Sequence, residues 1–284
     1  IFRISSYAYT LVEFSRIIGK TFDEATSEDF RKYVNFLVSK NKHSTIVEKM
    51  SRIRVFLRWL HNLPPNITPK PMAWFFRIRP KATKGRRELE IMEKMITEEE
   101  YYRLLRAASR PRTKALLQFM YESGARILEI LRVRIKDVDL LNRCAIVGKG
   151  KRFVPLANID HIRRWIRIHP LRYNPKAYLF CSMRDPHKPM SYQAVRMILI
   201  YLSRKAGIGR RIFPHMFRHA RASSLAKAGV SPYAMNVVMG WSEGSRMWRI
   251  YLHIACRDAV NEVLKKVRNN DKEKRVGTLH QYLE

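Results

Sequence analysis

Prolines followed by basic residues interrupt the chain well before its midpoint. Pro64, Pro65, Pro69 and Pro71 stand close together, and residues 77–87 then include six lysines and arginines but no acidic residue. Because proline fixes φ and lacks an amide hydrogen, neither a helix nor a central strand can continue through this stretch. The sequence therefore predicts two domains, at residues 1–76 and 97–284, joined by a basic linker at residues 77–96.

Helical spacing dominates the first domain. Apolar residues recur every three or four positions in residues 7–18, 27–39 and 44–60, which predicts three helices, with Ser27 as the N-cap of the second. The third helix carries a buried apolar stripe, and its basic side chains project elsewhere. A solvated basic face is the simple interpretation. In so basic a chain we favour a face that contacts phosphate groups through Arg52 and Arg58.

The second domain is predicted to contain helices around a small sheet. Thr97 and Glu100 form a capping box at the start of its first helix. Further helices are expected at residues 113–122, 191–206, 216–228, 231–239 and 255–267. Two apolar runs flank the Gly-Lys-Gly-Lys turn at 148–151 and predict a β-hairpin. The expected strands are residues 144–147, 153–156 and, as a candidate third, 178–180. The predicted fold class is mainly α, with a small antiparallel β-sheet in the second domain.

The charge of the chain narrows the classes of partner. Lys and Arg number 56 and Asp and Glu 24, which gives a formal net charge of +32. Such an excess is normally balanced by an acidic partner, nucleic acid being the commonest and an anionic membrane surface the rival. The sequence has no apolar run of the roughly 20 residues that cross a membrane. Its three cysteines form no Cys-x-x-Cys pair, which argues against disulfides and a zinc site and for a reducing, cytoplasmic location.

Short segments of the second domain carry candidate chemistry, although each is weak evidence alone. Arg126 follows a helix end and has Glu129 one turn later, a spacing that is common in surface ion pairs. Lys149 and Lys151 lie on the Gly-flanked turn, where a lysine can offer a point charge or a proton. A solvated turn lysine is the simpler interpretation of either residue.

Two later segments have the same ambiguity. His215 and Arg218 share a face at the start of a helix, where a guanidinium fork and a proton shuttle suit a phosphate group; exposed polar residues of a helix cap are the alternative. Trp241 offers an indole N–H but also suits a core position. Tyr251 is one of 13 tyrosines, so composition does not single it out.

Taken in this order, the segments resemble the catalytic domain of the tyrosine recombinases, the phage-type integrase and Xer family. The family pattern of Arg, Lys, His-x-x-Arg, His or Trp, and Tyr matches Arg126, Lys149, His215 with Arg218, Trp241 and Tyr251. The first domain is similar to the family's helical, SAM-like core-binding domain, so the resemblance covers nearly the whole chain. The hairpin is shorter than is usual, so Lys151 is an alternative to Lys149. The extra residue before Tyr251 leaves open whether it serves its own active site or a neighbour's.

The resemblance implies that Tyr251 cleaves a DNA phosphodiester and forms a 3′-phosphotyrosyl link, with no metal and no other cofactor. Arg126 and Arg218 would hold the non-bridging oxygens, and Trp241 would add a hydrogen bond. His215 would accept the tyrosine proton or orient the phosphate, and Lys149 would protonate the leaving 5′-hydroxyl. The residues in supporting roles would be Glu129 and Lys151. The linker side chains expected to contact the DNA backbone are Arg77, Arg79, Lys81, Lys84, Arg86 and Arg87.

We therefore expect a site-specific recombinase that integrates or excises a mobile element, with an archaeal virus or plasmid among the candidate sources. Xer-type resolution of chromosome dimers is the first alternative. A type IB topoisomerase uses the same set of Arg, Lys, Arg, His and Tyr and is a second alternative. A DNA-binding protein that has lost catalysis is the third. The expected partners are double-stranded DNA and further copies of the chain, four in the synapse and one or two when free.

Overall fold

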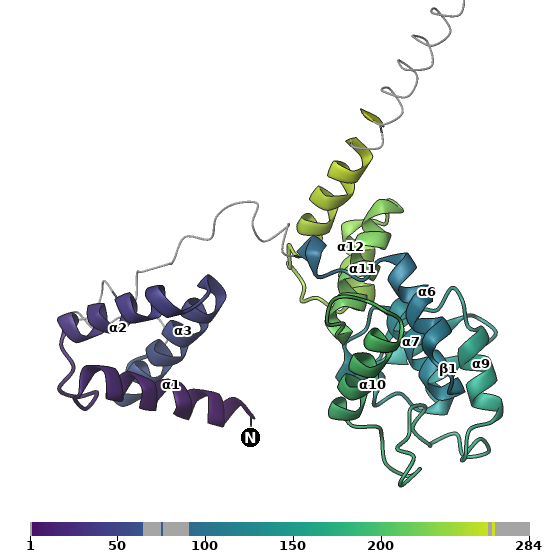
Figure 1. Ribbon diagram of the computed structural model, residues 1–284, viewed down its shortest axis with the longest axis horizontal. Coiled ribbons are helices and arrows are strands. Elements are labelled where there is room, and N and C mark those ends of the chain that lie inside the picture. Colours follow the sequence, from purple (N-terminus) through teal and green to yellow (C-terminus); the bar gives the residue numbers. More distant parts are fainter. Residues whose placement is uncertain (1, 65–74, 76–90, 261–262, 265–284) are drawn as a thin grey trace, which may run out of the picture. The chain divides into compact units, whose positions relative to one another are not determined.

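The computed structural model describes residues 2–64, 75, 91–260 and 263–264 (Figure 1). The chain divides into two compact units, Ile1–Arg87 and Glu88–Glu284. Each unit has an apolar core of its own. The predicted fold class is confirmed, because both units are helical and the second also holds a small antiparallel sheet. Residues 77–90 of the predicted linker lie outside the described residues.

Within residues 2–64, three helices build the first unit: α1 (Phe2–Ile18), α2 (Ser27–Lys40) and α3 (His43–Leu60). The prediction of these helices is confirmed, but the prediction that Ser27 is the N-cap of α2 is wrong. Thr26 caps the helix: its hydroxyl accepts a hydrogen bond from the Asp29 amide, and its own amide donates to the Asp29 carboxylate. Asp29, three residues after Thr26, completes a reciprocal capping box that Ser27 has no acid in position to form.

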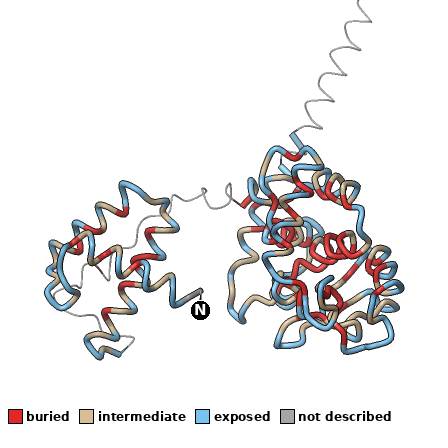
Figure 2. Tube along the Cα trace, turned by 60° about the horizontal axis from the view of Figure 1, so that its bottom comes forward, coloured by how far each residue is buried: buried red, intermediate tan, exposed pale blue. Residues whose placement is uncertain are grey.

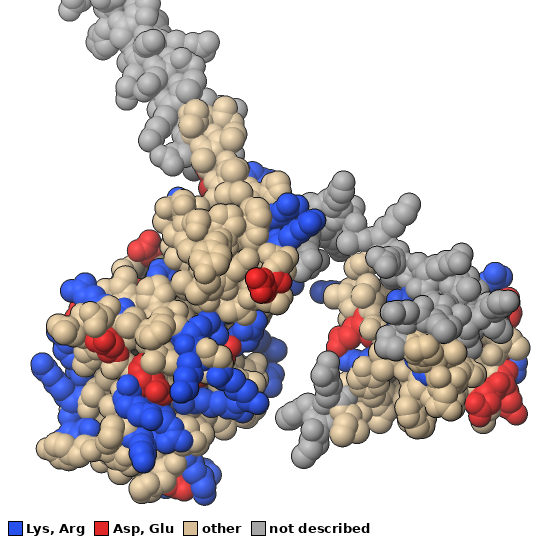
Figure 3. All heavy atoms as spheres, turned by 180° about the vertical axis from the view of Figure 1, so that it is seen from behind, with Lys and Arg blue, Asp and Glu red and all other residues tan. Residues whose placement is uncertain are grey.

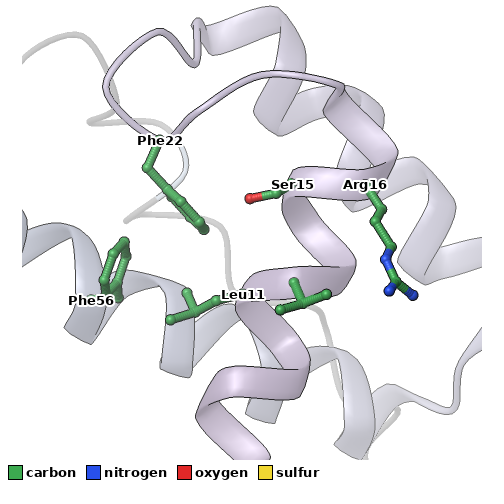
Figure 4. Close-up of a pocket in the computed structure, with 6 residues that line it drawn as sticks. Leu11, Ser15, Arg16, Phe22 and Phe56 are labelled. Carbon is green, nitrogen blue, oxygen red and sulfur yellow. The ribbon is translucent and has the colours of Figure 1, made fainter.

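A shallow pocket opens on the surface of the first unit (Figure 4). Leu11, Phe22 and Phe56 line it, and Ser15 and Arg16 are the polar residues among the described part of its lining. Phe22 and Phe56 meet edge to face, with 4.7 Å between their ring centroids. The described residues of the lining thus include no cluster of titratable groups, and we do not place the chemistry there.

The second unit is organised around α7, which packs against α6, α9 and α11. Its helices are α6 (Glu98–Ala107), α7 (Pro111–Ser123), α8 (Ile127–Ile130), α9 (Asp160–Arg167), α10 (Tyr192–Lys205), α11 (Pro214–Lys227) and α12 (Pro232–Met239). The predicted capping box at the start of α6 is confirmed, since the Glu100 amide donates to the Thr97 hydroxyl and the Thr97 amide to the Glu100 carboxylate. Figure 2 shows the buried residues concentrated inside this unit, beneath an exposed outer layer.

The sheet consists of β1 (Val138–Asp139), β2 (Cys144–Val147) and β3 (Arg152–Pro155), antiparallel and in that order. The predicted hairpin is confirmed, and its register pairs Val147 with Arg152 across the Gly-Lys-Gly-Lys turn. The prediction of a third strand at residues 178–180 is wrong, because β1 takes that position and Tyr178 forms only an isolated bridge with Arg134.

A further helix covers residues 248–260 and continues the chain after α12 (Figure 1). It begins before residue 255, where the sequence predicted its start, so Tyr251 lies on it. Tyr251 and Ile254 pack into an apolar cluster with Ala222 of α11 and with Met235 and Met239 of α12. This helix therefore sets the position of Tyr251. Among the described residues, no helix is both long enough and apolar enough to cross a membrane.

Candidate active site

A groove of about 1420 Å³ lies in the second unit, between α8, the β2–β3 hairpin and the C-terminal end of α12. Three of the six predicted catalytic residues line it, namely Arg126, Lys149 and Trp241. The two predicted supporting residues, Glu129 and Lys151, line it as well. The groove therefore gathers side chains from segments that are far apart in the sequence.

Arg126 stands at the N-terminal end of α8 with a half-exposed guanidinium group. Its Nη1 donates to Glu129 Oε1 at 3.2 Å, and both terminal nitrogens lie 3.2 Å from the Gly240 carbonyl oxygen. The Gly240 carbonyl thus fixes the guanidinium group of Arg126. The exposed part of that group remains available to an anion in the groove.

Arg218 is buried, with an exposed fraction of 4%. Its Nη1 donates to the Gly124 carbonyl at 2.9 Å and its Nη2 to the Met239 carbonyl at 2.5 Å. Burial, together with the nearby positive charges of Arg126 and Arg152, lowers the pKa of Arg218 to about 10. Among the described residues, no carboxylate forms an ion pair with it. A buried cation held only by carbonyl groups favours the arrival of an anion.

Arg152, which the sequence did not single out, lies on β3 and connects that strand to α8 and α12. Its Nη1 and Nη2 donate to the two oxygens of Glu129 at 2.9 and 2.7 Å, and its Nε donates to the Val238 carbonyl at 3.1 Å. Burial opposes ionisation of Glu129, but the bonds from Arg152 and from the Arg126 amide outweigh it and lower the pKa of Glu129 to about 2. No feature of the sequence distinguishes Arg152 from its many basic neighbours.

Gly240 is the tightest point of this arrangement. Its φ is +60°, and a Cβ built on it would lie 2.8 Å from the Cζ and Nη1 atoms of Arg152. We expect Gly240→Ala to destabilise the protein by roughly 1 kcal/mol from the left-handed backbone and by roughly 2 kcal/mol more from the displaced ion pair with Glu129. Urea unfolding of the purified variant measures the loss.

Gly229→Ala is the matched control for this substitution. Its φ is +72°, but no atom lies within 4 Å of the Cβ position, so it has the backbone penalty without the collision. Equal losses of stability in the two variants would contradict the role given to Arg152.

Tyr251 is buried beneath the groove, with an exposed fraction of 2%. Its ring stacks on Trp241, at 5.7 Å between centroids and 12° between planes. Its hydroxyl lies 2.7 Å from Nδ1 of His219. His219 was not among the predicted site residues, although a second histidine four residues after His215, hence on the same face of α11, was a signal that could have found it.

His215 lies at the exposed start of α11, and its ring contacts that of His219 edge to face at 4.4 Å. Partial burial, together with the charges of Arg218 and Arg126, lowers the pKa of His215. The hydrogen bond to Tyr251 comes from His219 and not from His215. His215 is therefore close to the two arginines, but it is not the imidazole that contacts the tyrosine.

Lys149 and Lys151 are both exposed on the hairpin turn and both line the groove. Lys151 has a left-handed backbone with φ of +46°, which closes the turn back into β3. Because both lysines of the short turn line the groove, either remains a candidate proton donor.

The predicted DNA-binding residues fall into two groups. Arg52 is engaged within the first unit, since its guanidinium donates to Thr10 at 3.0 Å and pairs with Glu48. Arg58 is half-buried on the same helix. The linker residues Arg77, Arg79, Lys81, Lys84, Arg86 and Arg87 lie outside the described residues. On the second unit, lysine and arginine side chains gather over one face (Figure 3).

Within the described part of the chain, no three residues among His, Cys, Asp and Glu are placed to hold a metal ion. The arrangement can instead hold an anion by two guanidinium groups and bring a tyrosine hydroxyl, an imidazole pair and a lysine close to it. Those groups are the ones that an attack on a phosphodiester would use.

Comparisons with known proteins agree with this chemistry. Residues 94–257 match the family model described as the phage integrase family. The chain is similar to the tyrosine recombinase XerC of Staphylococcus haemolyticus, with 26% identity over 94% of this chain and 89% of that protein. It is also similar to XerC of Bacillus subtilis, with 27% identity over 89% of this chain and 86% of that protein.

Solved structures show the same fold. XerA recombinase superposes with a TM-score of 0.53 at 24% identity, covering 92% of this chain and 91% of that one. XerH bound to its difH substrate before cleavage gives 0.65 at 18% identity, over 88% and 75%. A lambda integrase dimer bound to a core site gives 0.64 at 15% identity, over 88% and 71%.

Proposed function

The chain belongs to the phage integrase family, and from this premise we propose how its site works on DNA. It is a tyrosine-type site-specific recombinase, an enzyme that cleaves and rejoins duplex DNA. The observation that carries the proposed mechanism is the pair of guanidinium groups, Arg126 and Arg218, held by main-chain carbonyls beside the Trp241–Tyr251 stack. That arrangement supports the binding of one phosphate next to a tyrosine.

In the proposed reaction, the hydroxyl oxygen of Tyr251 attacks the phosphorus, its proton passes to an imidazole of α11, and the bond to the 5′ oxygen breaks. Arg126 and Arg218 hold the non-bridging oxygens, on which negative charge builds up. His215, at the exposed start of α11, orients the phosphate together with Trp241. Lys149 or Lys151 gives a proton to the departing 5′ oxygen, because an unprotonated alkoxide is a poor leaving group. The product is a 3′-phosphotyrosyl link that a 5′-hydroxyl can reverse.

Covalent capture tests this proposal. We expect the wild-type protein, mixed with a nicked duplex that carries its target and then denatured, to migrate as a protein–DNA adduct on a denaturing gel. Tyr251→Phe removes the attacking oxygen and is expected to abolish the adduct. Tyr233→Phe is a matched control, because Tyr233 is exposed on α12 and does not line the groove. An adduct formed by Tyr251→Phe would refute the assignment of the nucleophile.

We also propose a protein partner for the helix that begins at residue 248. Leu252, Val260, Val263 and Leu264 expose apolar side chains. We place them against a second copy of the chain, with four copies in the synapse; a lambda integrase of similar fold has been solved as a tetramer on a Holliday junction. Tyr251 contacts His219 of its own chain, which supports attack within its own active site.

For the biological role, we propose integration or excision of a mobile element. Resolution of chromosome dimers is the second candidate, favoured by the similarity to XerC proteins over 94% of this chain. Mapping of the cleavage site separates the two roles, since a tRNA gene or element end supports the first and a chromosomal junction the second.

A further inference from the structure

The hydrogen bond between His219 and Tyr251 points to a second imidazole in the reaction. We propose that His219 accepts the proton of Tyr251 during cleavage, while His215 serves only to orient the phosphate. This inference rests on the proposed function and adds a catalytic residue to it.

His219 and Tyr251 are in direct contact inside the second unit. Nδ1 of His219 lies 2.7 Å from the Tyr251 hydroxyl, and both residues are buried, with exposed fractions of 9% and 2%. A nucleophile within hydrogen-bond reach of a base, with the base itself held by a third group, is the usual arrangement of an activated nucleophile. The third group here is His215, whose ring meets that of His219 edge to face at 4.4 Å.

The surroundings of His219 disfavour a proton on its imidazole. Burial, then the neighbouring His215, Arg218 and Lys94, lower the pKa of His219 to about 4. The imidazole is therefore neutral near pH 7, and one of its nitrogens is an acceptor. When the tyrosine hydroxyl is the donor of this hydrogen bond, Nδ1 of His219 is the acceptor and is the atom that would receive the proton.

Binding of the phosphate raises the affinity of His219 for a proton. Arg218 is one of the cations that disfavour a proton on His219, and it is also one of the two arginines proposed to hold the phosphate. An anion beside Arg218 offsets its positive charge, so protonation of His219 becomes easier once DNA occupies the site. The base is thereby coupled to the presence of the substrate.

The proton balance of the step is complete. As the bond from the Tyr251 oxygen to phosphorus forms, the hydroxyl proton moves to Nδ1 of His219. As the bond from phosphorus to the 5′ oxygen breaks, that oxygen takes a proton from the lysine of the hairpin. Rejoining runs the same transfers backwards, so His219 returns its proton to the tyrosine.

The test compares single-turnover adduct formation on the nicked duplex. His219→Gln keeps an amide oxygen that can accept the tyrosine hydrogen bond but cannot take up a proton. We expect this variant to unfold at nearly the wild-type temperature and to form adduct at least roughly 100-fold more slowly. His219→Ala should be at least as slow. His187→Gln, an exposed histidine outside the groove, is the control and should react at the wild-type rate.

A modified substrate separates loss of the base from loss of the acid. Sulfur in place of the 5′ bridging oxygen leaves readily without a proton. It should restore the rate of a Lys149→Ala, Lys151→Ala double variant, but not that of His219→Gln. Adduct formation by His219→Gln within a few-fold of wild type, or its rescue by the sulfur substrate, would overturn the assignment. Failure of the wild-type protein to form any adduct would instead refute the proposed function itself.

Discussion

Arg218→Lys is expected to form the covalent adduct roughly 100-fold to 1000-fold more slowly than the wild-type protein, which corresponds to about 3 kcal/mol or more of lost transition-state stabilisation. A lysine keeps the positive charge but not the guanidinium fork, which donates to the Gly124 and Met239 carbonyls with two different nitrogens. Single-turnover cleavage at saturating protein measures the loss.

Binding of the duplex should change far less than cleavage in this variant. Phosphate contacts over a whole DNA site dominate affinity, and Arg218 contributes at most one of them. Fluorescence anisotropy at a fixed salt concentration is therefore expected to give a dissociation constant within a few-fold of wild type. Arg163→Lys, at an exposed position on α9, is the control for both assays. Parallel loss of binding and cleavage by Arg218→Lys would show that this arginine anchors DNA and does not act on one phosphate.

The second large effect is expected at the Glu129–Arg152 pair. Arg152→Gln leaves the mostly buried Glu129 carboxylate with only its longer contact to the half-exposed Arg126, and Glu129→Gln leaves Arg152 without its carboxylate, so each should cost roughly 3 kcal/mol of unfolding free energy. The double variant removes both charges and should lose clearly less than the sum, giving a coupling energy of about 2 kcal/mol. Urea unfolding followed by tryptophan fluorescence measures all three variants.

A surface pair provides the comparison for this cycle. Asp185 and Lys188 lie 3.1 Å apart with side chains exposed by 39% and 76%. Their coupling energy should stay below about 1 kcal/mol, because water screens exposed charges. A coupling at Glu129 and Arg152 as small as that of the surface pair would mean that the contact does not hold the groove together.

Features fixed by neighbouring residues were predictable from the sequence. The capping box of Thr97 and Glu100 and the hairpin around the Gly-Lys-Gly-Lys turn each depend on a few adjacent residues, and the structure confirms both. The prediction of Ser27 as the N-cap was wrong by one residue, because Thr26 is the position that has an acid three residues later. Local rules thus identify an element well but leave its boundary uncertain.

Features fixed by distant contacts were not predictable in the same way. The strand β1 is only two residues long, so its pairing with β2 decides its existence, and no periodic pattern marks it. The last helix was predicted from apolar residues at helical spacing in residues 255–267, whereas its first turns are fixed by packing of Tyr251 and Ile254 on α11 and α12. Arg152 and His219 acquire their roles from partners 23 and 32 residues away.

Because main-chain carbonyls anchor the three arginines, many substitutions around the site are compatible with the same positions of the guanidinium groups. Arg126, Arg152 and Arg218 donate to the carbonyl oxygens of Gly124, Val238, Met239 and Gly240. Every residue type supplies a carbonyl oxygen, so most side chains around the site can be exchanged without moving the guanidinium groups, provided that the backbone keeps its path. Inheritance of the site then requires few identical residues outside the reacting set, and chains that share only a quarter of their sequence can still present the same charges to DNA.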